Sequence, residues 1–143
     1  MQVLIAEDDR KTREILSNYL LEGGHEPILA TRGLDAVRMA TELRPPVVIL
    51  DGLLPELHGF EVARFLRDTL DYRPWIILVT AVYKASRYQR DAASKYGIDR
   101  YLIKPVSKED LLDAVSACES GDRPRPLFKE TPLATPGMTG TNT

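Results

Sequence analysis

The stretch "VVILDGLLP", residues 47–55, sets four aliphatic residues directly ahead of one aspartate, Asp51. An unbroken apolar run of this kind is typical of a strand that is buried on both faces of a parallel sheet. Gly52 and a turn ending in Pro55 close the stretch. We therefore expect a central strand with a carboxylate at its C-terminal end. The rest of the chain decides whether that carboxylate caps a strand or takes part in chemistry.

Short aliphatic runs alternate with longer amphipathic stretches outward from this strand. The aliphatic runs are QVLIA (2–6), EPILA (26–30), VVIL (47–50), WIILV (75–79) and RYLI (100–103). Apolar residues recur at helical spacing in the stretches 9–22, 33–44, 59–70, 84–96 and 107–119. This alternation is typical of a parallel sheet that is covered by helices on both faces. We expect an α/β fold with a five-stranded parallel doubly wound sheet, flavodoxin-like in its strand order 2-1-3-4-5 and flanked by five helices.

Helical spacing also indicates which side chains face the core. In the first two helices these are Ile15, Leu16, Tyr19, Leu20, Ala36, Val37, Ala40 and Leu43. Asp9 is a suitable N-cap for the first helix. Ser107, with Asp110 three residues further on, resembles a capping box at the start of the last helix, with aspartate in place of the usual glutamate or glutamine.

The composition fits a globular domain without strong attraction to nucleic acid. The chain has 143 residues, 43% of them hydrophobic, and a formal net charge of −2. Its one cysteine, Cys118, cannot form an internal disulfide, which favours a reducing compartment. The N-terminus lacks the basic start of a secretory signal, and no apolar stretch approaches the roughly 20 residues that cross a bilayer. We expect a cytoplasmic protein that contacts neither membrane nor nucleic acid.

Residues 120–143 differ in kind from the rest of the chain. They contain four prolines, five threonines and three glycines, and they show no helical or alternating period. Such a segment is typical of a flexible tail or linker. We therefore expect one domain over residues 1–119 and a flexible tail or linker over residues 120–143.

Polar side chains that can form one site follow four of the five expected strands, whereas the second, an edge strand, is followed only by Thr31 and Arg32. Glu7, Asp8 and Asp9 follow the first strand, Asp51 the third, Thr80 and Ala81 the fourth, and Lys104 with Pro105 the fifth. Because the C-terminal ends of parallel strands meet at one edge of the sheet, these side chains should lie close together. Two carboxylates about 4 Å apart repel by roughly 4 kcal/mol at an effective dielectric near 20. The cluster therefore indicates a Mg²⁺ site, beside which Lys104 and Thr80 line an anion position.

Four motifs occur together in the order and at the intervals of a known family. They are the acidic pair in LIAEDD (4–9), VVILDGLLPELHGFE (47–61), LVTA (78–81) and YLIKP (101–105). With them the chain resembles the receiver domain of bacterial two-component response regulators, over residues 1 to about 119. The combination is highly specific, although "KP" or "TA" alone would indicate nothing.

The resemblance implies a role for each residue at the strand ends. Arg13 stands five positions after Asp8, as a basic residue often does in the family, which selects Glu7 and Asp8 as the acidic pair. The implied roles are phosphoacceptor for Asp51, direct metal ligand for Asp8, metal contact through water for Glu7, metal contact through its backbone carbonyl for Leu53, phosphoryl partner for Lys104, hydroxyl donor for Thr80, backbone N–H donor for Ala81, and aromatic switch for Tyr101. Tyr101 also admits a structural interpretation, as an edge aromatic packed on the last helix.

The function that the resemblance implies is phosphoryl transfer in a phosphorelay. A histidine kinase or a histidine phosphotransfer protein would donate the group to Asp51, with Mg²⁺ or Mn²⁺ as the cofactor. The domain would catalyse its own phosphorylation and slow dephosphorylation without being an ordinary enzyme. Thr80 and Tyr101 would then report the phosphate to a protein-interaction surface. That surface comprises helix 84–96, strand 100–103 and helix 107–119.

Three positions near Asp51 depart from the pattern of the family. Gly52 stands where a bulky aliphatic residue is usual. Leu53 and Val82 lie two positions beyond Asp51 and Thr80, where side chains often tune dephosphorylation. Because both are apolar in this chain, we expect a poorly ordered attacking water and a long-lived phosphate.

The remaining polar features favour ordinary surface roles. We expect His25 and His58 to be exposed. Neither has a neighbour in the sequence that indicates metal binding or nucleophilic catalysis. Lys84, Arg87 and Arg90 form a solvated helix face or a docking face. Arg100 and Ala114 replace an acid and an arginine of a dimer network used by one subclass of receivers, so only a weak or phosphorylation-dependent dimer is expected.

Four hypotheses are compared at this level. The chain can be a stand-alone receiver, or a receiver module of a longer multidomain response regulator or hybrid kinase in which 120–143 is a linker. A phosphohydrolase of the haloacid-dehalogenase type also uses a strand-end aspartate and Mg²⁺, but Leu53 stands where its second aspartate is normal. A receiver that binds partners without phosphate is disfavoured, because all the key positions are filled.

Overall fold

The computed structural model describes residues 1–55, 57–81 and 96–121. The strands are β1 (Gln2–Ala6), β2 (Glu26–Ala30), β3 (Val47–Asp51), β4 (Trp75–Thr80) and β5 (Arg100–Ile103), and the helices are α1 (Arg10–Glu22), α2 (Gly33–Leu43), α3 (Gly59–Thr69) and α5 (Lys108–Glu119). The helix predicted over 84–96 and the tail predicted over 120–143 fall mainly on 82–95 and 122–143, outside the described residues. None of the four described helices has the length and apolar character that a membrane crossing requires.

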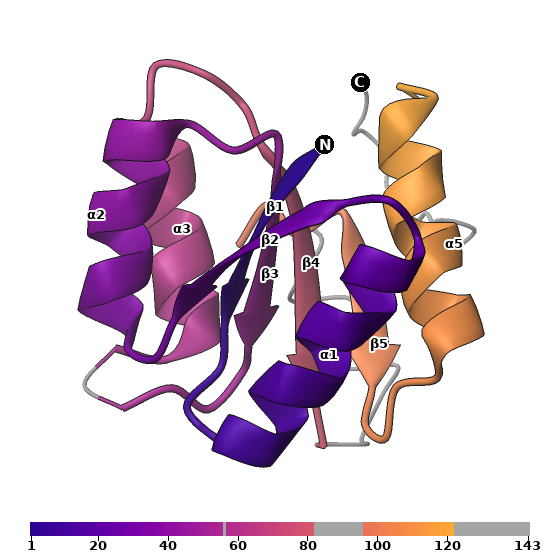
Figure 1. Cartoon of the computed structure of the whole chain (residues 1–143). Coiled ribbons are helices and arrows are strands. Elements are labelled where there is room, and N and C mark those ends of the chain that lie inside the picture. The colour runs from indigo at the N-terminus through magenta and orange to yellow at the C-terminus, as the bar shows by residue number, and fades with distance from the viewer. Residues whose placement is uncertain (56, 82–95, 122–143) are drawn as a thin grey trace, which may run out of the picture.

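The strands form one parallel sheet in the order β2-β1-β3-β4-β5, which confirms the predicted topology. β3 lies in the middle and pairs with β1 on one side and β4 on the other. In Figure 1, α2 and α3 cover one face of the sheet, and α1 and α5 cover the other. The strand order reverses between β1 and β3, so the C-terminal ends of these two strands form the crevice where doubly wound folds bind ligands.

Two apolar clusters fill the layers on either side of the sheet. The cluster toward α2 and α3 includes Leu4, Val48, Leu50, Leu78, Val62 and Leu66. The cluster toward α1 and α5 includes Val3, Ile5, Ile49, Val79, Leu16, Leu20, Leu111 and Val115. Side chains alternate between the two layers because successive strand residues point to opposite faces. All of β3 is buried, so the strand that carries Asp51 is fixed from both sides.

The predicted caps of the first and last helices are confirmed. Oδ2 of Asp9 accepts hydrogen bonds from the Thr12 N–H at 2.9 Å and from the Thr12 hydroxyl at 2.7 Å. Oγ of Ser107 accepts the N–H of Asp110 at 3.0 Å. Each bond satisfies an N–H that the first helical turn would otherwise leave without a partner.

The predicted inward stripes of α1 and α2 are too wide. Leu16 and Leu20 are buried as predicted, but Ile15 is 43% exposed and Leu43 is 47% exposed. Neighbouring residues on a helix point about 100° apart, so Ile15 turns away when Leu16 faces the sheet. Leu43 is the last residue of α2. Apolar spacing therefore located the inward faces but overestimated their width.

The two histidines differ in their surroundings. His25 is 8% exposed, so its predicted exposure is wrong. Its Nδ1 lies 3.5 Å from the Met1 amino nitrogen and 4.0 Å from Oε2 of Glu119. These neighbours come from the two ends of the domain, so local sequence could not indicate them. His58 is exposed, as predicted, and is the N-cap of α3, where Glu61 accepts its backbone N–H at 3.2 Å.

A buried ion pair links α3 to the N-terminal ends of β4 and β5, at the opposite end of the strands from Asp51. Nη2 of Arg67 lies 2.9 Å from Oδ2 of Asp99, and the two side chains are 10% and 5% exposed. The guanidinium also donates to the carbonyls of Gly97 and Pro74 at 2.9 and 2.7 Å. The Asp99 carboxylate accepts the N–H of Ile76 at 2.9 Å. Hydrogen bonds on both partners offset the cost of removing the two charges from water.

Candidate functional site

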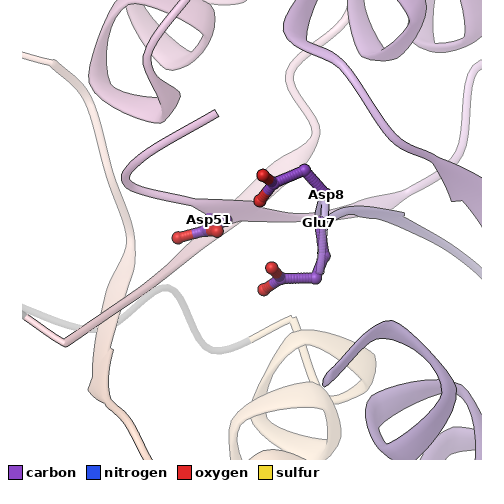
Figure 2. A group of neighbouring side chains, drawn as sticks. All are labelled: Glu7, Asp8 and Asp51. Atoms are coloured by element: carbon purple, nitrogen blue, oxygen red, sulfur yellow. The ribbon is translucent and has the colours of Figure 1, made fainter. Parts of the chain in front are cut away.

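Three carboxylates converge at the C-terminal edge of the sheet. Glu7 and Asp8 directly follow β1, and Asp51 is the last residue of β3. Figure 2 shows the three side chains turned toward a common space. One oxygen from each carboxylate lies within 4.8 Å of the others. Glu7 and Asp51 are 1% and 6% exposed, whereas Asp8 is exposed, so the cluster opens to solvent on the Asp8 side.

Lys104 supplies the positive charge of the site. Its Nζ lies 3.1 Å from Oε1 of Glu7 and 3.4 Å from Oδ2 of Asp51. The lysine follows β5 directly, and its backbone N–H donates to the Thr80 carbonyl at 2.8 Å. The predicted strand-end lysine therefore reaches both buried acids, and its side chain is only 24% exposed.

The cluster carries more negative than positive charge, and this imbalance contributes to the pKa shifts of Glu7 and Lys104. Burial, together with the nearby Asp51 carboxylate, raises the pKa of Glu7 to about 7, although the Asp9 N–H and the Lys104 ammonium oppose this rise. Burial lowers the pKa of Lys104, but the Glu7 and Asp51 carboxylates outweigh burial and raise this pKa above its ordinary value. One ammonium group therefore compensates only part of the charge of three carboxylates.

The acids fit a divalent cation. Oε2 of Glu7 accepts the N–H of Asp9 at 3.1 Å. Oε1 of Glu7 is buried and, among the described residues, has no well-directed hydrogen bond, although Lys104 forms an ion pair with it. Mg²⁺ and Mn²⁺ favour oxygen ligands and bind to one or two carboxylates with waters completing the shell. A buried carboxylate oxygen beside an exposed aspartate meets that requirement.

The turn after Asp51 orients the Asp51 carboxylate. The backbone N–H of Leu53 donates to Oδ1 of Asp51 at 3.2 Å, while the Leu53 side chain is 59% exposed. Gly59 closes the turn, since a Cβ there would lie 2.1 Å from the Asp51 carbonyl oxygen. Only glycine allows the start of α3 to approach the end of β3 so closely.

Thr80 and Ala81, the predicted hydroxyl donor and small residue, lie at the end of β4. Thr80 is 1% exposed, with its side chain on the α3 side of the sheet, and Ala81 is exposed at the rim. Arg13 donates from Nη1 to the carbonyls of Glu7 and Asp8 at 2.9 and 3.3 Å. The arginine used to choose the acidic pair thus holds the backbone of that pair.

Tyr101 lies inside the protein, on the α3 side of the sheet. The residue is 8% exposed and belongs to the cluster that packs between the sheet and α2 and α3. Its interpretation as an edge aromatic packed on the last helix is wrong, because α5 covers the opposite face. Strand alternation explains the side: Tyr101 pairs with Leu78, whose side chain faces the same layer.

An apolar groove adjoins the acidic cluster, and sequence reasoning missed it. The groove has a volume of about 450 Å³ and is lined by Thr12, Ile15, Leu16, Tyr19, Val79, Ala81, Lys104, Pro105 and Val106. It runs between α1 and the segments that follow β4 and β5. The available signal was Ile15, an apolar residue beside the inward stripe of α1, which marks one wall of this groove.

The fold and the acidic site define the class first: a flavodoxin-like α/β domain with a carboxylate cluster and a lysine where the strand order reverses. The chain belongs to the response regulator receiver domain family, whose model matches residues 3–116. Members of this family are signalling modules of two-component systems rather than classical enzymes.

Curated relatives and solved structures agree with this assignment. The response regulator MprA of Mycobacterium leprae is 39% identical over 117 residues, which cover 82% of this chain and 50% of that protein. MprA of Mycobacterium bovis is 38% identical over the same length. The chemotaxis response regulator CheY4 of Vibrio cholerae is 27% identical, with a TM-score of 0.74, over 82% of this chain and 97% of that chain.

One similar structure is described with a metal ion. The receiver domain of the sensor histidine kinase PA1611 from Pseudomonas aeruginosa carries magnesium coordinated in its active-site cleft. It is 27% identical to this chain, with a TM-score of 0.74, over 83% of this chain and 97% of that chain. The chain spans about half the length of the curated relatives it matches.

Proposed function

We propose that this domain is a phospho-accepting receiver of a two-component phosphorelay. Asp51 takes a phosphoryl group from a histidine kinase or a histidine phosphotransfer protein. The observation that carries the proposal is the position of Lys104, whose ammonium contacts Asp51 and Glu7 at the strand ends. An ammonium held against the acceptor carboxylate stabilises negative charge on the transferred group.

The reaction is an in-line displacement at phosphorus. An oxygen of Asp51 forms the new O–P bond while the N–P bond to the donor histidine breaks, and the electron pair of that bond returns to the imidazole. The Leu53 N–H orients the acceptor carboxylate. Lys104, the Thr80 hydroxyl and the Ala81 N–H bind the oxygens of the transferred group. The product is a mixed anhydride on Asp51, which water cleaves slowly.

The acidic cluster is assigned to Mg²⁺ or Mn²⁺. Asp8, Asp51 and the backbone carbonyl of Leu53 would hold the ion directly, and Glu7 would contact it through water. When bound, the ion neutralises the carboxylates and the oxygens of the transferred group. The magnesium in the similar PA1611 receiver supports this assignment.

The switch consists of Thr80 and Tyr101. Both are buried in the layer toward α3, so a shift of Thr80 toward a phosphoryl group changes the packing around the tyrosine. The output surface comprises 84–96, β5 and α5, of which the first lies mainly outside the described residues. Phosphorylation acts by shifting the population between two arrangements of this surface.

The apolar groove is assigned to docking of the phosphodonor. It opens beside Lys104 and Ala81, so a helix seated in it would place its histidine next to Asp51. Apolar contacts near Ile15 would supply affinity, while the acidic cluster would supply the chemistry.

The dimer surface of one receiver subclass is incomplete in this chain. The Asp99 carboxylate is 5% exposed and bonded to Arg67 and the Ile76 N–H, so it serves the fold rather than a partner. Ala114 is buried in the α5 interface. We therefore assign only a weak or phosphorylation-dependent dimer.

We assign residues 1–119 to the receiver and 120–143 to a tail or linker. Because the matched 117 residues make up only 50% of the relative MprA, a longer response regulator with further domains fits as well as a stand-alone receiver. A cytoplasmic location suits either form. Membership of the receiver family removes the reason to consider a dehalogenase-type phosphohydrolase.

Beryllofluoride binding tests the proposal, because this anion mimics a phosphoryl group on a carboxylate. Amide NMR spectra are recorded with Mg²⁺, with and without beryllofluoride, for the wild type and Asp51→Asn. We expect large shifts around β3, β4 and β5 in the wild type only. Unchanged spectra, or equal shifts in the variant, would overturn the proposal.

A further inference from the structure

The glycine after the acceptor needs an explanation other than backbone conformation. Gly52 is buried, and it is not among the glycines with positive φ, which are Gly24, Gly97 and Gly121. Alanine could adopt the backbone angles of Gly52 without the strain of the left-handed region. The reason for glycine at this position is therefore space.

Thr80 occupies the space that a side chain at position 52 would need. A Cβ on Gly52 would lie 3.1 Å from both Cβ and Oγ1 of Thr80, and 3.7 Å from Cε2 of Phe60. Threonine is branched at Cβ and has few alternative rotamers. A methyl group at position 52 would therefore require Thr80 to shift by a few tenths of an ångström, and rotation of the hydroxyl alone would not relieve the contact with Cβ.

The backbone of Gly52 cannot easily move to relieve this contact. Its N–H donates to the Val79 carbonyl at 2.9 Å, and its carbonyl accepts the N–H of Gly59 at 3.3 Å. These bonds tie it to β4 on one side and to α3 on the other. Thr80 is thus the group that would give way.

The direction of that displacement leads toward Tyr101. The strand order is β3-β4-β5, so a push on Thr80 away from β3 moves its side chain toward β5. There Ile103 pairs with Thr80, and Tyr101, which pairs with Leu78, is the next residue of β5 on the same face. The rings of Phe60 and Tyr96 are in tilted contact with their centroids 5.0 Å apart, and both pack against the cluster that contains Tyr101. Thr80, the ring pair and Tyr101 therefore share one packed layer.

We propose that Gly52 is a positioning residue that presets the switch of this receiver. With no side chain at position 52, Thr80 packs over the glycine and Tyr101 stays buried before any phosphoryl group is bound. A side chain at 52 displaces Thr80 and drives Tyr101 toward solvent, and phosphoryl contacts then draw Thr80 back. The proposal rests on the proposed function, since Thr80 and Tyr101 act as the switch in it.

Fluorine NMR on fluorotyrosine-labelled protein tests the proposal through the exposure of one residue. The Tyr101 signal is assigned with Tyr101→Phe, and its solvent exposure is read from the shift between light and heavy water. Wild type and Gly52→Ala are compared without ligand and with Mg²⁺ and beryllofluoride. We expect a buried signal in both wild-type states, an exposed signal in unbound Gly52→Ala, and a return to the buried signal on binding.

A double variant shows whether Tyr101 responds to the contact between position 52 and Thr80 or to a general disturbance of the fold. In Gly52→Ala/Thr80→Ser, the smaller serine can turn away from the new methyl, so Tyr101 should return to its buried signal. A folded Gly52→Ala protein with Tyr101 as buried as in the wild type would overturn the proposal. An exposed Tyr101 in the unbound wild type would also overturn it. This measurement on the wild type remains decisive even if Gly52→Ala does not fold.

The two proposals fail in different ways. If the amide spectrum of the wild type does not respond to beryllofluoride, the phosphoacceptor function is wrong, whatever the Tyr101 signal shows. The comparison of the unbound proteins still decides the role of Gly52, because it depends only on packing around Thr80.

Discussion

Lys104 is the residue on which the charge balance of the site depends. It contacts both buried acids, and its substitution leaves Glu7 and Asp51 facing each other without a cation. We predict that Lys104→Ala weakens beryllofluoride binding by about tenfold or more, because a fixed cation beside the bound anion is lost. A titration followed by NMR in the presence of Mg²⁺ measures this affinity.

Lys108 provides the matched control for that substitution. It pairs with Glu22 on the surface, where its side chain is 51% exposed. Lys108→Ala should therefore leave the affinity unchanged, since exposed ion pairs contribute little. Equal losses in the two variants would mean that Lys104 acts through general charge rather than through its contacts.

Leu53 bears on the lifetime of the phosphorylated state. Its side chain is exposed beside the acceptor and offers no polar group that could order an attacking water. We predict slow hydrolysis of the phosphate on Asp51, and a several-fold faster loss in Leu53→Asn, which introduces such a group. The decay of phosphoprotein after removal of the donor checks this, and a wild-type half-life of seconds would contradict it.

At the scale of elements, the Arg67–Asp99 pair couples α3 to β4 and β5. Arg67→Met leaves a carboxylate buried without its counter-charge, so we predict a loss of about 3–5 kcal/mol in the free energy of unfolding. Arg64→Met is the control, because Arg64 is 60% exposed on the same helix. Urea unfolding measures both variants. A loss for Arg67→Met as small as that of the control would show that the pair contributes nothing.

The groove beside α1 gives a second prediction at this scale. Ile15 lines the groove, whereas Leu21 is 57% exposed on the same helix and does not line it. We predict that Ile15→Asp slows transfer from a phosphorylated histidine kinase by about tenfold, since it places a charge in an apolar contact. Transfer from acetyl phosphate should stay unchanged.

Leu21→Asp tests whether the position matters rather than the added charge. It should behave as the wild type with both donors. If Ile15→Asp slows both donors equally, the substitution disturbs the site itself and the groove is not the docking surface.

At the scale of the whole molecule, the sequence was sufficient to predict the strand order and the clustering of the site residues at one edge of the sheet. Apolar strands that alternate with amphipathic helices allow few arrangements, and the five predicted strands match the observed ones to within one residue. Glu7, Asp8, Asp51 and Lys104 meet because parallel strands end at one edge. Local pattern and topology together were enough for that result.

Features that depend on distant neighbours were not predictable. His25 is buried, and its ring lies beside Met1 and Glu119, which are far from it in the sequence. Tyr101 faces α3 rather than α5 because of strand register. Gly52 was recognisable as unusual, but only the position of Thr80 explains it.

The most direct test of the central claim is the site and chemical nature of phosphorylation. The purified protein is incubated with Mg²⁺ and acetyl phosphate, and its intact mass is measured before and after treatment with hydroxylamine, which cleaves acyl phosphates. We predict the mass of one added phosphoryl group, lost on that treatment and absent in Asp51→Asn. An unmodified wild type, or an equally modified Asp51→Asn, would contradict the assignment of Asp51 as the phosphoacceptor.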